Sequence, residues 1–228
     1  MAWLDELLDT THQALVDLPE NSEPREFLRG RGVTDAQIQQ YRLGFAPADL
    51  TIGTCTAEFW KWQRKYWSNR LVFPLYSTLG HAIGLQTRSL RDKQYQQFYA
   101  YDRGIYPYLF GLPVALPEIW RTRQVVVVEG VFDCLAVGQV APNAVATLTA
   151  NIPRACRTFL WRYATRVTAL LDMDETGREK AADLQRFAPP GRQVVIPVYE
   201  GHDPGDLARF GRVADLRRAL RYVQEVVP

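Results

Sequence analysis

Two hydrophobic patterns divide the chain into a first and a second half. In residues 1–45, apolar side chains recur at helical spacing, as at Leu4, Leu8 and Leu15, which predicts amphipathic helices. The stretch RLVFPLYSTLGHAIGLQTRSL (70–90) then reads as two apolar strands joined by a turn at Gly80. We therefore expect a small α+β part in the first half of the chain.

Local signals mark the ends of two helices in this first part. Ser22 precedes a Glu-Pro pair, and glycines follow at positions 30 and 32, which are residue types that begin and end helices. Thr34 stands three residues before Gln37, the spacing of a capping box. Two short helices are expected, one between Ser22 and the glycines and one beginning after Thr34.

The second half predicts a parallel sheet. Short apolar runs without alternation are typical of strands that are buried on both faces. Because helical stretches separate these runs, the pattern is a βαβ alternation. The four runs are QVVVV (124–128), AVATL (144–148), RVTALL (166–171) and QVVIPV (193–198).

Acidic side chains follow three of these four runs. In a parallel sheet the carboxyl ends of the strands lie at one edge, where ligands bind. Carboxylates gathered there would repel one another unless a cation lay among them, and oxygen ligands suit Mg²⁺ or Mn²⁺. Acids also cap helices, but three clusters in one small sheet favour a metal site for phosphoryl chemistry. The acids are Glu129, Asp133, Asp172, Asp174, Asp203 and Asp206.

Residues 59–108 are rich in both basic and aromatic side chains. Eight of them are lysine or arginine and only two are acidic, so this window could neutralise the phosphates of a nucleic acid. Its aromatic side chains, including Trp67 and Tyr95, could stack on unpaired bases or could fill the core. The sequence leaves both interpretations of the aromatic residues open.

Composition adds limits to these predictions. With 228 residues, 47% hydrophobic and 23% charged, the chain can form one large or two small globular domains. The cysteines at 55, 134 and 156 form no CxxC pair, which argues against a cysteine zinc site and for a reducing compartment. No apolar run suits a membrane span or a signal peptide, so we expect a cytoplasmic protein. His12 is expected on a helix surface.

Several motifs together resemble a known family. VVVVEGVFDCLAVGQVAPNAVATLTANI (125–152), ALLDMDETGREKA (169–181) and GHDPGDL (201–207) resemble the three acidic motifs of a Toprim domain. The preceding REFLRGRGVTDAQIQQYRLGFAP, NRLVFPLYSTLGHAIGLQTRSL and YPYLFGL resemble the catalytic core of DnaG-type bacterial or phage primases. The resemblance implies an α/β fold: a Toprim-type parallel sheet flanked by helices (121–228), preceded by a smaller α+β amino-terminal subdomain (1–120).

The resemblance also implies an activity. Such a core makes short RNA primers on single-stranded DNA from ribonucleoside triphosphates, with Mg²⁺ or Mn²⁺ as cofactor. The implied catalytic residues are Glu129, Asp133, Asp172 and Asp174. The implied metal ligands are Glu129, Asp172, Asp174, Asp203 and Asp206. The implied nucleic-acid or nucleotide contacts are Arg70, Arg88, Arg91, Lys93, Arg103 and Gly130.

The chain shows no zinc-binding or helicase-binding domain of the kind usual in full-length bacterial primases. We therefore expect a minimal form, phage-encoded or plasmid-encoded, or one whose helicase or zinc module is a separate protein. Two other functions stay open. A Toprim nuclease would use the same acids with water as nucleophile and His202 as a candidate base. A non-catalytic single-strand-binding replisome adaptor would have kept the fold alone.

Overall fold

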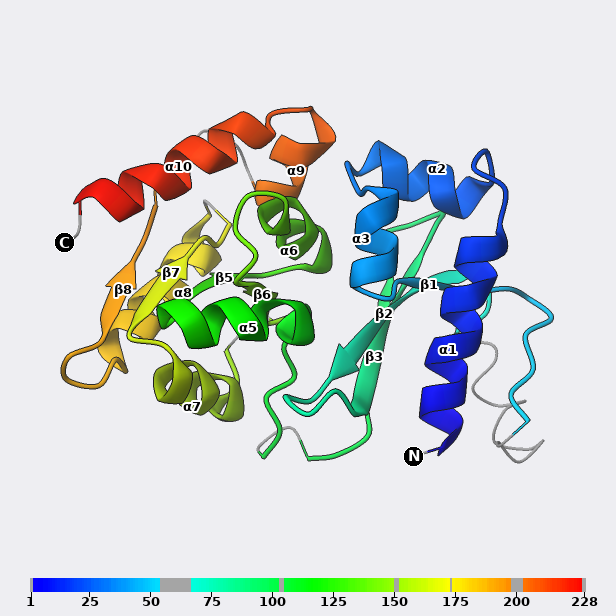
Figure 1. Ribbon diagram of the computed structural model, residues 1–228, viewed down its shortest axis with the longest axis horizontal. Helices are drawn as coiled ribbons and strands as arrows, with labels where there is room; N and C mark the ends of the chain where they lie inside the picture. The colour runs from blue at the N-terminus through cyan, green and yellow to red at the C-terminus, as the bar shows by residue number, and fades with distance from the viewer. Residues whose placement is uncertain are drawn as a thin grey trace. The chain divides into compact units, whose positions relative to one another are not determined.

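A computed structural model describes residues 2–53, 67–102, 105–149, 152–172, 174–197 and 203–226 of the chain, with side chains up to residue 221. The fold consists of two compact units, Met1–Asp102 and Arg103–Pro228 (Figure 1). The predicted boundary, between residues 120 and 121, would have placed the segment 105–120 in the first unit. In the structure this segment packs with the second unit, because Leu112 and Ile119 share a core with Val125 and Val127.

Over its described residues, 2–53 and 67–102, the first unit is a four-stranded antiparallel sheet with three helices. The strand order is β1-β2-β3-β4, and the predicted hairpin is confirmed, with Leu71 opposite Arg88 and Gly80 in the turn at a φ of 79°. The elements are α1 (Ala2–Asp17), α2 (Glu23–Gly30), α3 (Asp35–Gln40), β1 (Gly44–Ala46), β2 (Arg70–Tyr76), β3 (Ala82–Ser89) and β4 (Tyr95–Tyr99).

The helix ends in this unit follow the sequence signals. Ser22 is the N-cap residue of α2, although its side chain makes no capping hydrogen bond. Thr34 forms the predicted capping box with Gln37. The expectation for His12 is wrong, because its side chain is only 8% exposed and its Nδ1 lies 2.7 Å from the carbonyl oxygen of Leu43. That carbonyl directly precedes β1, so His12 connects α1 to the sheet.

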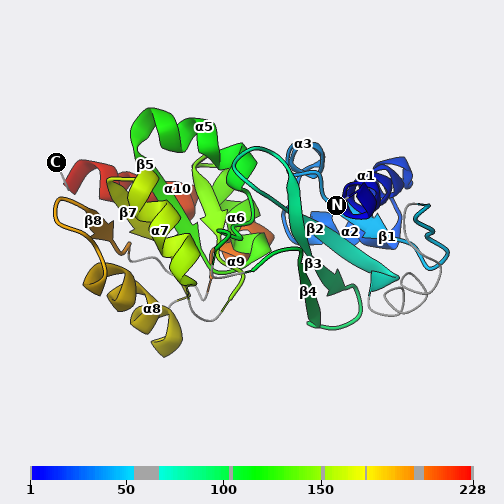
Figure 2. The ribbon, with the colours of Figure 1, turned by 90° about the horizontal axis from the view of Figure 1, so that it is seen from below.

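The second unit is a parallel sheet with helices on both faces (Figures 1 and 2). Its strand order is β6-β5-β7-β8, and every strand pair is parallel, as predicted. The elements are α5 (Leu112–Thr122), β5 (Gln124–Val128), α6 (Val131–Gly138), β6 (Ala144–Ala146), α7 (Arg154–Tyr163), β7 (Arg166–Ala169), α8 (Glu175–Arg186), β8 (Gln193–Val195), α9 (Pro204–Arg209) and α10 (Val213–Val226).

Successive side chains of β5 point to opposite faces of the sheet, and their contacts show which helices cover each face. Val125 and Val127 belong to a core that α5, α7 and α8 complete. Val126 and Val128 point to the opposite face, where α6 contacts β5 and where α9 and α10 pack on α6. Three strands are shorter than their apolar runs; β6, for example, ends at Ala146, and Leu148 then takes a positive φ of 60°. No helix in the described ranges is long and apolar enough to cross a membrane.

Candidate catalytic site at the carboxyl edge of the parallel sheet

Glu129 and Asp133 follow the central strand β5. Glu129 comes directly after Val128, and Asp133 lies in the first turn of α6. The Asp133 carboxylate accepts hydrogen bonds from two backbone N–H groups, that of Gly130 at 2.9 Å and that of Gly205 at 2.9 Å. Asp133 therefore joins the loop after β5 to the start of α9, two segments far apart in the sequence.

Asp172 and Asp174 follow β7 and lead into α8. Asp174 is the N-cap residue of α8, and its Oδ1 accepts from the Gly177 N–H at 2.8 Å. A Cβ atom at Gly177 would lie 2.0 Å from the carbonyl oxygen of Asp172, so this close approach requires glycine. Glu129 Oε1 accepts from the Asp172 N–H at 3.3 Å, which ties the end of β7 to the end of β5.

Lys180 is a charged residue of this candidate site that sequence reasoning missed. It lies on α8, and its Nζ forms an ion pair with Glu129 Oε2, with side-chain exposures of 6% for Lys180 and 19% for Glu129. The sequence signal that could have indicated its burial was its position on the helix. Gly177, Lys180, Ala181 and Leu184 recur at helical spacing and are the buried residues of α8. Lys180 supplies the cation that the repulsion argument required among the acids.

Burial, and after it mutual repulsion, raise the pKa of two of these carboxyl groups. Burial first, and then the charge of Asp203, raise the pKa of Asp133 to about 8, although the N–H groups of Gly205 and Gly130 oppose the shift. Burial and the charges of Glu129, Asp203 and Asp174 raise the pKa of Asp172 to about 6, against the opposing charge of Lys180. One lysine therefore does not balance the negative charge at this edge.

Asp203 and Asp206 lie at the start of α9. Asp203 is its N-cap residue and accepts from the Asp206 N–H at 2.6 Å. Asp206 lies 4.0 Å from Arg209, on the next turn. The two acids are thus joined through the cap of α9.

The candidate ligands do not form a closed metal cage. Over the described residues, which omit Met173 and 198–202, no group of three His, Cys, Asp or Glu side chains is arranged to hold a metal ion. The donor chemistry nevertheless fits Mg²⁺, because that ion takes one or two carboxylates together with substrate phosphates and water. Metal binding by Glu129, Asp172, Asp174, Asp203 and Asp206 stays a prediction.

Two of the predicted basic contacts are built into the antiparallel sheet. Arg88 is only 4% exposed, and its guanidinium lies 4.4 Å from the centre of the Phe27 ring. It donates to the Ser89 carbonyl at 2.7 Å and to the Tyr95 hydroxyl at 3.2 Å. Arg70 donates to Thr87 Oγ1 at 3.0 Å, and burial lowers its pKa. Both arginines therefore contribute to the packing of the sheet.

The remaining basic candidates are exposed or lie outside the described residues. Arg91 and Lys93 are exposed in the turn between β3 and β4. Trp67 belongs to the core, where it stacks on Trp3 with ring centroids 6.0 Å apart, so the core interpretation holds for this aromatic residue. Several residues considered in the sequence analysis lie outside the described residues: the basic residues Lys61, Arg64, Lys65 and Arg103, the candidate base His202, and Cys55.

A comparison with protein families indicates the class of domain in the second unit. Residues 126–208 match the protein family described as Toprim-like. This range runs from within β5 to within α9 and contains all six candidate acids. Most of the second unit is therefore similar to the Toprim-like family.

Over nearly its whole length the chain is similar to bacterial DNA primases. It is 26% identical to the DNA primase of Treponema pallidum (strain Nichols), over 94% of this chain and 39% of that protein. The crystal structure of the Aquifex aeolicus primase (zinc-binding and RNA polymerase domains) matches with a TM-score of 0.76 and 24% identity, over 96% of this chain and 59% of that one.

A structure of the DnaG primase catalytic domain bound to single-stranded DNA matches with a TM-score of 0.75 and 23% identity, over 97% of this chain and 77% of that one. The predicted resemblance to the DnaG-type catalytic core with a Toprim domain is thus confirmed, as is the predicted α/β fold class. The chain spans about two fifths of the length of the curated primases that it matches.

Proposed function

We propose that this chain is a primase catalytic core that makes short RNA primers on single-stranded DNA from ribonucleoside triphosphates. One observation carries the proposal. The fold of primase catalytic cores extends over nearly the whole chain, and the acids of its Toprim-like domain lie at the carboxyl edge of the sheet, where α/β sheets bind ligands.

Within this proposal, Mg²⁺ or Mn²⁺ is the cofactor, and Glu129, Asp172 and Asp174 are its principal ligands, with Asp203 and Asp206 beside them. A bound divalent cation would stabilise the negative charge that develops on the phosphates during nucleotidyl transfer. The pKa values of Asp133 and Asp172 are raised by burial first and then by neighbouring carboxylates, and this second contribution supports a cation site, because a bound cation would offset it.

The protein's own contribution is to hold these acids in place. Lys180 and the Asp172 N–H each take one oxygen of Glu129, which fixes its carboxylate between the ends of β5 and β7. Asp133 holds the loops of Gly130 and Gly205 with its two oxygens. We therefore propose that Asp133 positions the loops of the site. Glu129, Asp172 and Asp174 would hold the cation that contacts the reacting phosphates.

The proposed template contacts belong to the first unit. Arg91 and Lys93 are exposed in the turn between β3 and β4, where basic side chains can neutralise template phosphates. Arg70 and Arg88 would hold this turn from within, since Arg70 also donates to the Gln94 carbonyl. The partners proposed for the chain are single-stranded DNA and ribonucleoside triphosphates, with a replicative helicase or a zinc-module protein as a further partner.

The test is primer synthesis from labelled ribonucleotides on single-stranded DNA with Mg²⁺ or Mn²⁺, comparing wild type with Asp172→Ala. Short RNA from the wild type alone supports the proposal. Cleavage of labelled DNA without nucleotides would replace it with the nuclease function. DNA binding that ignores EDTA and gives no product, even with a primase zinc module added in trans, would replace it with the adaptor function.

A further inference from the structure

The stretch between the candidate acids Asp133 and Asp172 carries only positive charge. From residue 134 to residue 171 the sequence has four arginines and no aspartate, glutamate or lysine. Three of these arginines, Arg154, Arg157 and Arg162, belong to α7, and the first and last of them are exposed. This charge lies outside both the basic window 59–108 and the carboxylate edge of the sheet.

The three arginines of α7 line a cavity of about 430 Å³. Phe187, which follows the end of α8, and the buried Trp161 supply apolar surface to the same cavity. Among the described residues that line it, none is acidic. None of the three arginines forms an ion pair within the described part of the chain. The cavity therefore carries three positive charges that no described carboxylate offsets.

These arginines form a row along one side of α7. Arg154 begins the helix and Arg162 lies in its last turn, so the two positions are about 12 Å apart along the axis. The helix connects β6 to β7, and both strands run parallel to β5. It therefore starts at the carboxyl edge of the sheet, where the candidate acids lie, and ends at the opposite edge. The row leads away from the candidate catalytic site along the outside of the second unit.

Phe187 adds an exposed aromatic ring to this row. The residue is 51% exposed, and the guanidinium group of Arg157 lies 4.7 Å from the centre of its ring. Proteins that bind single-stranded nucleic acids combine a basic path for the backbone with aromatic rings on which bases stack. An acidic peptide could also pair with the arginines, but an exposed ring among them favours a polyanion that carries flat bases.

We propose that Arg154, Arg157, Arg162 and Phe187, together called the α7 surface, bind single-stranded DNA. The arginines would contact successive phosphates, and Phe187 would contact a base. Phosphates follow one another about every 3.4 Å along one strand of a duplex, so a row of about 12 Å has room for roughly two to four of them. A linear polyanion matches such a row better than a single compact anion does.

This inference rests on the proposed function, since it gives the same single-stranded DNA a second contact besides Arg91 and Lys93. The α7 surface belongs to the second unit, which also carries the candidate catalytic acids. DNA bound along α7 would therefore be held by the same unit that holds the reacting groups.

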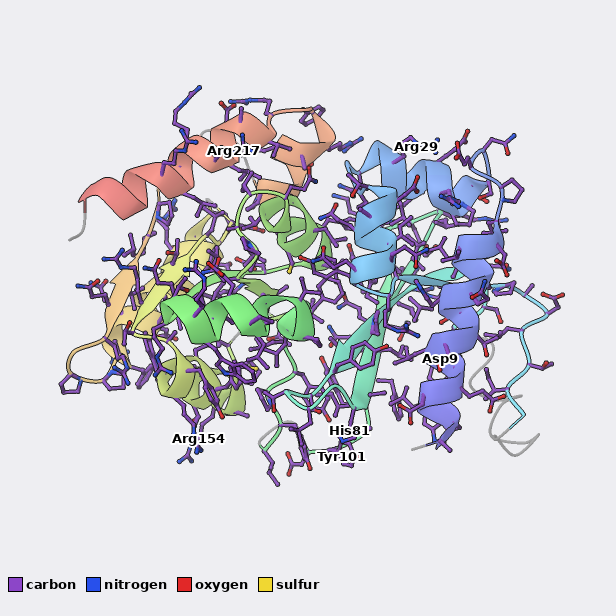
Figure 3. All side chains as sticks on the ribbon, viewed as in Figure 1. Asp9, Arg29, His81, Tyr101, Arg154 and Arg217 are labelled. Carbon is purple, nitrogen blue, oxygen red and sulfur yellow. The ribbon has the colours of Figure 1, made fainter. Side chains whose placement is uncertain are left out.

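The experiment is fluorescence anisotropy of the full chain with a labelled single-stranded oligothymidylate, in EDTA and without nucleotides, over a series of salt concentrations. EDTA removes divalent cations, so metal-dependent binding at the carboxylate edge does not contribute. The test variant is Arg154→Ala/Arg162→Ala, which leaves Arg157 in place on Phe187. The matched control is Arg217→Ala/Arg221→Ala, which removes the same charge from two exposed positions on α10. Figure 3 marks Arg154 on α7 and Arg217 on α10.

We expect the test variant to bind the oligonucleotide at least about tenfold more weakly than the wild type at low salt. Its slope of log K against log salt should fall by about 1.4, at about 0.7 per phosphate contact, while the control keeps the slope of the wild type. Phe187→Leu keeps an apolar side chain but removes the ring. This variant should weaken binding by at least about fivefold without changing the slope, because it removes a stacked base and no charge.

The proposal is overturned if the test variant keeps the slope of the wild type, if the control loses as much affinity, or if Phe187→Leu binds like the wild type. It is also overturned if polyglutamate of equal charge displaces the oligonucleotide as well as unlabelled DNA does, because the surface would then fit an acidic protein.

Primer synthesis is measured separately on the same proteins, so that the two proposals can fail independently. A wild type that makes no primer but shows the expected differences in binding would contradict the proposed function and support the α7 surface. A wild type that makes primers, beside a test variant with unchanged DNA binding, would overturn the α7 surface alone.

Discussion

The ion pair between Lys180 and Glu129 allows a sharp test of how the carboxylate edge is held. We consider Lys180→Met, which keeps an unbranched side chain one atom shorter than lysine but removes its charge. The two side chains are 6% and 19% exposed. Removing one partner from a buried ion pair costs about 3–5 kcal/mol, because the other charge is left uncompensated. Glu129 keeps the Asp172 N–H and some contact with water, so we expect the lower end of this range.

A second substitution separates the charge effect from lost packing. In Lys180→Met/Glu129→Gln the carboxylate that Lys180 paired is neutral as well, and we expect a loss of only about 1 kcal/mol. The measurement is amide hydrogen exchange in β5 and β7 across a denaturant series, because these strands report on the second unit alone. Arg218→Met, which removes an exposed pair with Asp215 at 3.4 Å, is the surface control and should cost at most about 1 kcal/mol.

The reasoning would fail if Lys180→Met cost no more than the surface control. It would also fail if the double variant were less stable than the single one, because the remaining negative charge would then not be the source of the loss. Either result would mean that water screens the pair, and that Lys180 does not fix the carboxylate of Glu129.

Three further predictions concern the site and the template contacts. Gly177→Ala would place a Cβ atom 2.0 Å from the Asp172 carbonyl oxygen, so we expect loss of primer synthesis and a lower melting temperature. The control is Gly30→Ala, whose Cβ atom would have no atom within 4 Å and which should leave both measurements unchanged. The pKa of Asp172 is raised from 3.8 to about 6, so the folded state binds its proton more tightly and loses stability as the pH rises from about 4 to 6. Urea midpoints should therefore show Asp172→Asn gaining stability relative to wild type over that interval, then no further; a constant difference would contradict the shift. Arg91→Ala/Lys93→Ala should weaken binding to single-stranded DNA and reduce the slope of log K against log salt by roughly 1.4, at about 0.7 per phosphate contact; an unchanged slope in salt titrations would exclude these contacts.

The sheet of the second unit could be predicted because its signal is local. Runs such as QVVVV have no alternation, and a strand with this pattern must be covered on both faces. The acids after the strands then followed from topology, because parallel strands bring their carboxyl ends to one edge. What the pattern could not give was the partner of each acid. Lys180 is a charged residue on a polar helix, and only its helical spacing from Ala181 and Leu184 marks the buried face.

The roles of the basic window were harder to predict, because charge alone does not indicate burial. Arg88 was expected to contact template or nucleotide, but its side chain is stacked on Phe27 and buried in the antiparallel sheet. The long apolar stem of arginine allows such packing when the head group finds acceptors, here Ser89 and Tyr95. His12 was misassigned for a related reason. Its partner, the Leu43 carbonyl, is 31 residues away, and no local pattern predicts a contact at that separation.

The two hydrogen bonds to Asp133 have a consequence for anyone who divides this chain into fragments. One of its oxygens depends on the N–H of Gly205, which comes after the last strand of the sheet. A fragment that ends with β8 would keep all four strands and still leave a buried carboxylate without one of its donors. Such a loss costs about 1–3 kcal/mol, and more for a charged group. We therefore expect a stable fragment of the second unit to extend through α9, even though α9 adds no strand to the sheet.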